Sequence, residues 1–282
     1  SPVNARHVLA TYGTAIAALC LFTFFAIAAD NFINPINLVN VLKQVSFLAI
    51  LGIGFSLAFT VAELDLSFAA VCSLCAVVVG GLIFHKFPPV FAVAAAIAVG
   101  LCAGVLNGLL VTRLRIPSLI ATLAMASVAT GLGFAITGGV AFVGRWDPAF
   151  LALGRGSLLG VPALILWTAV VAIFVQLVLT QTRLGLHLVF TGEAEEAARL
   201  AGVKVKRMKV TGLAFSGLCA GLVGVLLAAT LNSAAPDIAK DYLLTSIAAV
   251  LLGMTMFEPD AATSRARSSA RRPSACSATA WY

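Results

Sequence analysis

Long apolar runs separated by short polar loops follow one another along almost the whole chain. Seven runs have the length of membrane spans, at residues 8–29, 46–62, 66–84, 89–112, 118–137, 158–180 and 210–231, and a shorter eighth covers 242–257. Hydrophobic residues make up 61% of the 282 positions and charged residues 10%, against about 45–50% and about 25% in soluble domains. Apolar stretches of about 20 residues cross a bilayer as helices. The sequence therefore predicts an all-α, polytopic transmembrane bundle with about eight spans, in one domain over residues 1–257.

The first run and the last run need separate interpretation. The first follows Arg6 and ends in "AIA", as a secretory signal peptide would, but its 22 residues exceed the roughly 7–15 apolar residues of a signal. We interpret it as the first membrane helix. The last run holds 16 residues, and a helix of that length reaches about 24 Å, less than the roughly 30 Å hydrocarbon core.

The charged loops indicate how the chain is threaded through the membrane. Cytoplasmic loops collect Lys and Arg, and the strongest basic loops are 113–117 and 182–209. Placing both in the cytoplasm puts the N-terminus there too. The loops at 30–45, 85–88, 138–157 and 232–241 then lie outside. The net charge of +7 therefore reflects topology and contact with membrane lipid, and we expect no nucleic-acid partner.

Small side chains inside the spans indicate close helix packing. They are dense in "GLCAGVLNGLL" and "GLAFSGLCAGLVGVLLAA", and small faces let helix backbones approach each other in lipid. Cys72 and Cys75 spell C-x-x-C, but no second pair and no nearby His accompany them. We interpret both as small buried side chains rather than as a metal or redox site.

The sequence lacks the patterns that an enzyme would need. It contains no G-x-x-x-x-G-K-[ST] phosphate-binding loop, so if the protein works with ATP, another subunit must bind the ATP and its Mg²⁺. No nucleophile and base stand in a recognisable pattern, and His187 has no partners at metal-ligand spacing. We expect no catalytic residues, no metal site and no cofactor in this chain.

A polar segment at residues 191–209, "TGEAEEAARLAGVKVKRMK", interrupts the apolar pattern. Its acids stand at the start and its cations at the end, as the dipole of a short helix favours, and Gly202 is a plausible helix C-cap. The sequence predicts a short polar helix between two membrane helices on the inner face. It is either a solvated connector or a docking element for a cytoplasmic partner.

Three polar positions near the spans have two interpretations each. Glu63 and Asp65 border two short spans, and acids inside a membrane are typical of functional sites. Alternatively they lie at the inner interface, where Asp65 with Ser67 caps the next helix. Asn107 either lines a path through the membrane or bonds to a neighbouring helix.

Three stretches, which follow the family's order along the chain, resemble one family of transport proteins. "GEAEEAARLAGVKVKRMK" resembles the cytoplasmic coupling loop of permease subunits from ATP-binding-cassette (ABC) importers of the ribose, xylose and arabinose kind, a group related to branched-chain amino acid permeases. "NLVNVLKQVSFLAILGIGFSLAFTVAELDLSFAAV" resembles the family's segment that ends in D-L-S. "AGVLNGLLVTRLRIPSLIATLAMASVATGLGFAITGG" resembles its "G-x-x-N-G…P-x-F-I-A-T-L…T-G-G" region. The matching positions there are Asn107, Gly108, Pro117, Ile120, Ala121, Thr122, Leu123, Thr137, Gly138 and Gly139.

The resemblance implies a role and a set of partners. The chain would form the translocation pathway for a small sugar, a pentose or hexose, in a bacterial inner membrane. Its partners would be a second permease subunit, a cytoplasmic ATP-binding subunit and a periplasmic sugar-binding protein. The second permease subunit would be another copy of this chain, so that the two form a homodimer. The alternatives are an amino-acid or nucleoside permease of the same superfamily, a secondary transporter or membrane scaffold, or an inactive truncated product.

The resemblance also implies two groups of site residues. The ATPase-coupling loop, about 182–209, would use Gly192, Glu193, Glu195, Glu196, Ala197, Ala198, Arg199, Leu200 and Gly202. The translocation pathway would use Glu63, Asp65, Ser67, Asn107 and Thr122. The family usually has G-G before I-D-L-S, whereas Ala62 and Glu63 stand here, and a residue with a Cβ is less permissive than Gly at a sharp bend.

The last residues, 258–282, differ from the rest in composition: "EPDAATSRARSSARRPSACSATAWY". The resemblance ends at Pro259, where family members continue into further membrane helices. With TCN codons for Ser, a reading frame shifted by one base permits an apolar, small-residue-rich sequence similar to the family's next helix. We interpret the tail as frameshifted and unstructured and the chain as truncated. The alternative is a genuine basic tail that binds anionic lipid.

Overall fold

The computed structural model describes residue 16 and residues 19–28 and 32–257. The start of the first predicted span and the tail at 258–282, with its frameshift interpretation, lie outside the described residues. The chain divides into two units, residues 34–247 and residues 1–33 together with 248–282. In the latter unit, the structure describes an apolar helix at Leu19–Ala28 and the last turns of α11.

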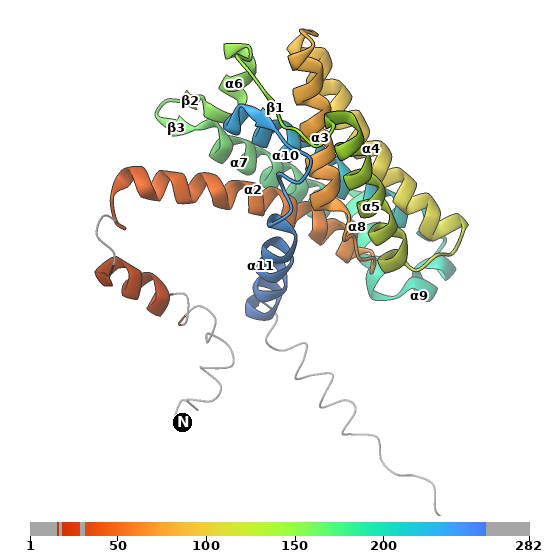
Figure 1. The fold of residues 1–282 in the computed structure, drawn as a ribbon. Coiled ribbons are helices and arrows are strands. Elements are labelled where there is room, and N and C mark those ends of the chain that lie inside the picture. The colour runs from red at the N-terminus through yellow and green to blue at the C-terminus, as the bar shows by residue number, and fades with distance from the viewer. Residues whose placement is uncertain (1–15, 17–18, 29–31, 258–282) are drawn as a thin grey trace, which may run out of the picture. The chain divides into compact units, whose positions relative to one another are not determined.

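The unit 34–247 is built from helices (Figure 1). They are α2 (Pro35–Thr60), α3 (Phe68–Phe84), α4 (Pro89–Arg113), α5 (Ser118–Thr137), α6 (Pro148–Arg155), α7 (Ala163–Gln181), α8 (Arg183–Glu193), α9 (Glu195–Leu200), α10 (Val205–Leu231) and the start of α11 (Tyr242–Phe257). Strand β1 (Phe142–Val143) pairs antiparallel with β4 (Ser233–Ala234), and β2 (Ser157–Leu158) pairs with β3 (Val161–Pro162). Each strand holds two residues, so the predicted all-α class is confirmed.

Each of the eight predicted runs contains one apolar helix. Helices α2, α4, α5, α7 and α10 are long and apolar enough to cross a membrane, by length and composition. The helix at Leu19–Ala28, α3 and the apolar part of α11 at Tyr242–Met254 are shorter. The predicted polytopic helical bundle is therefore confirmed as a class, with five full-length spans in the described part of the chain.

Among α2 to α11, three helices begin five or more residues away from the start of their apolar run. Helix α2 begins at Pro35, where Asn34 Oδ1 accepts a hydrogen bond from the Ile36 N–H (3.0 Å). Helix α10 begins at Val205 because its basic first turns are good helix formers despite their charge. Helix α7 begins later than expected, because residues 157–162 form a β-hairpin with positive φ at Leu159 and Gly160.

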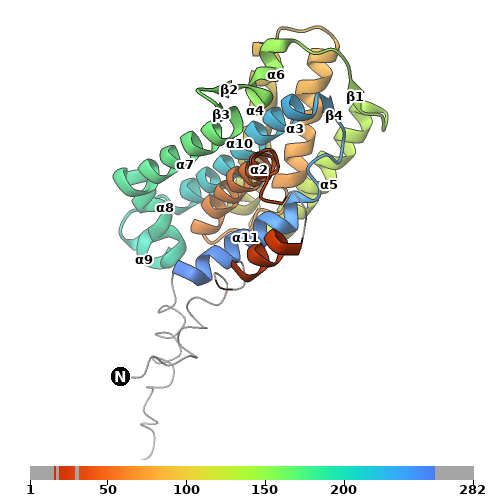
Figure 2. The ribbon, with the colours of Figure 1, turned by 90° about the vertical axis from the view of Figure 1, so that its left-hand side faces the viewer.

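Helix α10 is the central helix of the unit and packs against α2, α3 and α4 (Figure 2). In an 18-residue apolar stretch of α10, 78% of the residues are buried, whereas in the corresponding stretch of α7 only 11% are. The contact of α10 with α4 brings the two backbones together. A methyl group at Gly104 would overlap the Leu213 carbonyl oxygen, and one at Gly217 would overlap the Gly100 carbonyl oxygen. The predicted close packing of small residues is confirmed.

The loops of the unit gather at the two ends of α10. At its Leu231 end, β4 pairs with β1, and the Asn232 side-chain amide donates a hydrogen bond to the Gly144 carbonyl (3.0 Å). At its Val205 end lie α8, α9 and residues 61–67, the α2–α3 loop. The same division follows from the predicted topology, in which 138–157 and 232–241 share one side of the membrane and 113–117 and 182–209 share the other.

Candidate functional site

The predicted polar segment at 191–209 contains one whole short helix, α9, between the end of α8 and the start of α10. Helix α8 ends at Glu193, α9 spans Glu195–Leu200, and α10 begins at Val205. The expected short polar helix is therefore present, but a second helix, α8, precedes it, because Thr182 caps α8 by accepting a hydrogen bond from the Gly185 N–H (3.1 Å). The break falls at Ala194, whose backbone is not helical (φ −151°, ψ 77°).

Gly202 ends α9 in the way the sequence predicts. Its φ of +84° is left-handed. The Gly202 N–H donates to the Arg199 carbonyl (3.0 Å), and the Val203 N–H donates to the Ala198 carbonyl (2.9 Å). These two bonds form a Schellman motif, which satisfies the last carbonyls of a helix. The chain can therefore turn sharply from α9 into α10.

The surface of α9 is charged and exposed. The predicted coupling residues Glu193, Glu195, Glu196, Ala197, Arg199, Leu200 and Gly202 are exposed, Gly192 is half-buried, and Ala198 is buried. Arg199 and Glu196 form an ion pair in which both side chains are about two-thirds exposed, and such pairs add little stability. Leu200 is 81% exposed. The helix thus presents charges and one large apolar side chain, and Ala198 holds it to the unit.

Helix α8 ties this surface to the end of α2. Leu188 and Thr191 are buried, and a methyl group at Gly192 would overlap the Thr60 carbonyl oxygen. The backbone of α8 therefore lies directly against the last turn of α2, so α8 and α9 are held against the membrane helices.

The α2–α3 loop begins with a residue in the left-handed conformation. Ala62 has a φ of +58°, its N–H donates to the Phe59 carbonyl (2.9 Å), and the Glu63 N–H donates to the Ala58 carbonyl (3.1 Å). This is the same helix-ending motif that Gly202 makes. The bend that the family's glycines would allow is retained here by Ala62, at a cost of roughly 1–2 kcal/mol for a side chain with a Cβ.

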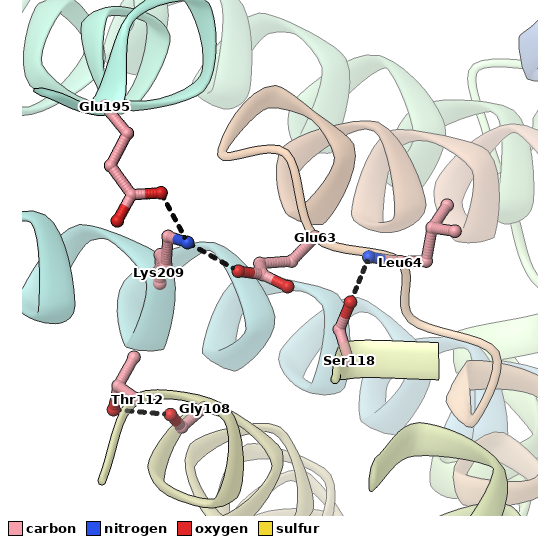
Figure 3. A network of polar contacts seen from close by, with 7 residues as sticks. All are labelled: Glu63, Leu64, Gly108, Thr112, Ser118, Glu195 and Lys209. Atoms are coloured by element: carbon pink, nitrogen blue, oxygen red, sulfur yellow. Dashed lines mark hydrogen bonds and ion pairs between the residues drawn. The ribbon is translucent and has the colours of Figure 1, made fainter. Parts of the chain in front are cut away.

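Glu63 is buried and belongs to an ion-pair network with Lys209 and Glu195 (Figure 3). The Lys209 Nζ lies 2.8 Å from Glu63 Oε1 and 3.0 Å from Glu195 Oε2. The Lys209 ammonium therefore joins a carboxylate of the α2–α3 loop to one of α9. Sequence reasoning missed Lys209, whose only signal was that it is the last cation before the apolar part of α10.

Asp65 and Ser67 connect the same loop to α4. Asp65 Oδ1 accepts hydrogen bonds from the Ser67 N–H (2.9 Å) and Oγ–H (2.6 Å), and the Asn107 Nδ2–H donates to Ser67 Oγ (2.8 Å). Asp65, rather than Ser67, thus supplies the side-chain acceptor at the start of α3. Burial raises the pKa of the Asp65 carboxyl, and the hydrogen bonds from Ser67 and Ser216 oppose the rise.

Ser118 and Thr122 connect the loop to the start of α5. The Leu64 N–H donates to Ser118 Oγ (3.2 Å), and the Leu66 N–H donates to Thr122 Oγ1 (3.1 Å). Alternate residues of the loop are thus held by hydroxyls one helical turn apart. Ser118 was also missed from the sequence, because nothing local shows that its hydroxyl meets a loop so distant in the chain.

The structure brings the five predicted pathway residues together around the α2–α3 loop. They are Glu63, Asp65, Ser67, Asn107 and Thr122, and all five are buried. Asn107 makes a bond between α4 and the loop, which was one of its two expected roles. Asn107 Oδ1 is buried without a hydrogen-bond partner in the described part of the chain. Cys72 and Cys75, which we interpreted as small buried side chains, are both buried, with free thiols.

These features define a multi-pass helical membrane protein with a buried polar loop and an exposed polar segment at one end. The family model for the permease component of branched-chain amino acid transport systems matches residues 37–268, and the chain belongs to this family. The match extends past Pro259, where we placed the end of the resemblance. The chain is thus a transport component.

Several characterised permeases are similar over most of the chain. The ribose import permease protein of Bacillus subtilis (strain 168) is 32% identical over 254 residues, 90% of this chain and 79% of that protein. The ribose import permease protein of Escherichia coli (strain K12) is 34% identical over 244 residues, 85% and 76% of the two chains. The L-arabinose ABC transporter permease protein of Azospirillum brasilense is 32% identical over 258 residues, 90% and 76%. No solved structure was found to match.

Proposed function

We propose that this chain is the membrane-spanning permease subunit of an ABC importer and forms the path for a small sugar, a pentose or hexose. The observation that carries the proposal is the similarity to ribose and arabinose permeases at 32–34% identity over 85–90% of the chain. The sugar arrives on a periplasmic binding protein. The chain itself carries out no catalysis, and ATP and Mg²⁺ bind to a separate ATPase subunit.

The ATPase subunit docks on α8 and α9. The residues of this coupling site are Gly192, Glu193, Glu195, Glu196, Ala197, Ala198, Arg199, Leu200 and Gly202. The exposed charges of α9 and the exposed Leu200 provide the contact surface. The close contact of Gly192 with Thr60 supports a mechanical role, because a displacement of α8 must also displace α2 where their backbones touch.

The coupling site faces the cytoplasm, and the N-terminus lies on the same side of a bacterial inner membrane. Lys and Arg at 113–117 and 182–209 support this orientation through their preference for cytoplasmic loops. Two copies of the chain form the pathway as a homodimer. ATP binding changes the relative populations of outward-open and inward-open states. The proposed translocation-pathway residues are Glu63, Asp65, Ser67, Asn107 and Thr122, and they lie where this change would reach the membrane helices.

The docking site can be tested by reversing two exposed acids. The double variant Glu193→Lys with Glu196→Lys should release the ATPase, because it reverses two exposed charges of the docking surface. Neither acid contacts Lys209, so the ion pairs of Lys209 are left in place. The measurement is co-purification of the tagged chain with candidate ATPase subunits, together with ATP hydrolysis stimulated by the loaded binding protein. The matched control is Asp237→Lys with Asp241→Lys, two exposed acids near the other end of α10. Retention of the ATPase by the Glu193/Glu196 variant would refute the docking assignment.

The substrate class has one serious alternative. The family description names branched-chain amino acids, so an amino-acid permease is the second candidate, with a nucleoside permease as a further member of the superfamily. Uptake by proteoliposomes that contain the chain, its ATPase and its binding protein separates them. Uptake of ribose or arabinose and not of leucine or adenosine is expected. Uptake by the chain without an ATPase would instead support a secondary transporter, and no uptake in any case would support a scaffold or inactive product.

A further inference from the structure

We infer that Lys209 is the positioning residue that connects the coupling helix α9 to the start of α5. It does so through Glu63 and the α2–α3 loop, so that the state of the docking surface reaches a membrane helix by a direct chain of polar contacts. This inference rests on the proposed docking of an ATPase at α8 and α9. It goes further by naming the residue that carries the movement inward.

The first link is one ammonium group shared by two carboxylates (Figure 3). Lys209 Nζ lies 2.8 Å from Glu63 Oε1 and 3.0 Å from Glu195 Oε2. The side chains of Lys209, Glu63 and Glu195 are 16%, 8% and 58% exposed. The bridge therefore has a buried inner half, toward the loop, and an exposed outer half, toward the docking surface.

The second link is the backbone of the loop itself. Glu63 is followed directly by Leu64, whose N–H donates to Ser118 Oγ (3.2 Å), and the Leu66 N–H donates to Thr122 Oγ1 (3.1 Å). Ser118 is the first residue of α5. A shift of the loop backbone at Glu63 would therefore either move the first turn of α5 or stretch these two bonds, of which the one to Ser118 is exposed and the one to Thr122 is part-buried.

The two halves of the bridge respond differently to a docked partner. An ion pair in contact with water is weakened by solvent and salt, so the Glu195 half is weak while α9 is uncovered. A protein that covers Glu195 lowers the dielectric constant around it and strengthens its attraction to Lys209. The buried Glu63 half changes little. Docking thus tightens the outer half of the bridge and ties α9 to the loop.

The test uses the full chain with its ATPase and binding protein in proteoliposomes. Lys209→Met should leave the ATPase bound and hydrolysing ATP but lower ribose or arabinose uptake per ATP about tenfold, within the usual range of coupling between sites. Lys206→Met is the matched control. It removes an exposed cation in the same turn of α10, which makes no ion pair within the described part of the chain. Equal uptake per ATP in the two variants would overturn the inference.

Two further variants separate positioning from folding and from docking. Lys209→Arg keeps the charge and should retain uptake per ATP, whereas Lys209→Met keeps most of the side-chain volume and should still lose it, so the two variants together separate charge from packing. Glu195→Gln removes the carboxylate that forms the outer half of the bridge, at an exposed position. It should lower uptake per ATP more than Glu196→Gln does, because the Glu196 carboxylate pairs with Arg199 and not with Lys209. If Glu195→Gln and Glu196→Gln behave alike, α9 acts by docking only and the bridge is refuted. If the unmodified chain binds no ATPase, the proposed function itself fails.

Discussion

Lys209 and Glu63 together show how one buried charge depends on its partner. Each side chain is less than one-fifth exposed, and their charged atoms lie 2.8 Å apart. Removal of a single partner from such a pair leaves the other charge buried without compensation, whereas removal of both is far less costly. The pair therefore stabilises the native contact of α10 with the α2–α3 loop mainly by avoiding an isolated charge.

This dependence predicts a specific pattern of stabilities. Lys209→Met should lower the free energy of unfolding by about 3–5 kcal/mol, and the double variant Lys209→Met with Glu63→Gln should recover most of that loss. Denaturant unfolding of the purified chain in detergent measures both values, with Lys206→Met as the exposed control. A double variant as unstable as the single one would show that Lys209 stabilises the fold by packing and not by its charge.

At the level of elements, the contact between α4 and α10 depends on glycine. A methyl group at Gly104 would overlap the Leu213 carbonyl oxygen and would lie 2.9 Å from the Ala214 Cα. Both obstacles belong to the backbone, which cannot rotate away as a side chain can. The sequence predicted that these stretches pack closely, because small residues are dense in both. The pairing of α4 with α10 was not predicted, since many helices here carry small residues.

Gly104→Ala should therefore destabilise the chain, by about 1–3 kcal/mol for an overpacked contact. Gly131→Ala is the matched control, because a methyl group there meets nothing within 4 Å and alanine favours the helix. Thermal unfolding and the fraction of monodisperse protein after size-exclusion chromatography report the difference. Equal midpoints for the two variants would mean that α4 and α10 lie farther apart than described.

For the whole molecule, the positions of the loops give a test of membrane topology. Leu159, in the turn between β2 and β3, is 98% exposed, and Leu200, in α9, is 81% exposed. Leu200 lies in the loop 182–209, which the sequence places in the cytoplasm. Leu159 fell in the predicted span 158–180, but the structure puts it in the β2–β3 turn, directly after the loop 138–157 that the sequence places outside. Nothing in the arrangement of helices alone decides which side is the cytoplasm.

Leu159→Cys should react with a membrane-impermeant maleimide in spheroplasts, and Leu200→Cys should react only in inside-out vesicles. The unmodified chain gives the background from its own cysteines. The expected labelling follows from the basic residues at 113–117 and 182–209, which favour the cytoplasmic side. The opposite pattern would invert the proposed orientation and place α9 out of reach of a cytoplasmic ATPase.

The sequence by itself determined the class of the protein, the approximate spans and the short polar helix that ends at Gly202. Hydropathy, charge and helix-ending signals are local along the chain. The sequence misplaced the starts of α2 and α10, where polar residues continue a helix. Only the tertiary structure decided that Glu63, Glu195 and Lys209 meet and that the loop after α2 is bonded to Ser118 and Thr122. These residues come from separate elements, and only the packing of α2, α5, α9 and α10 brings their side chains within bonding distance.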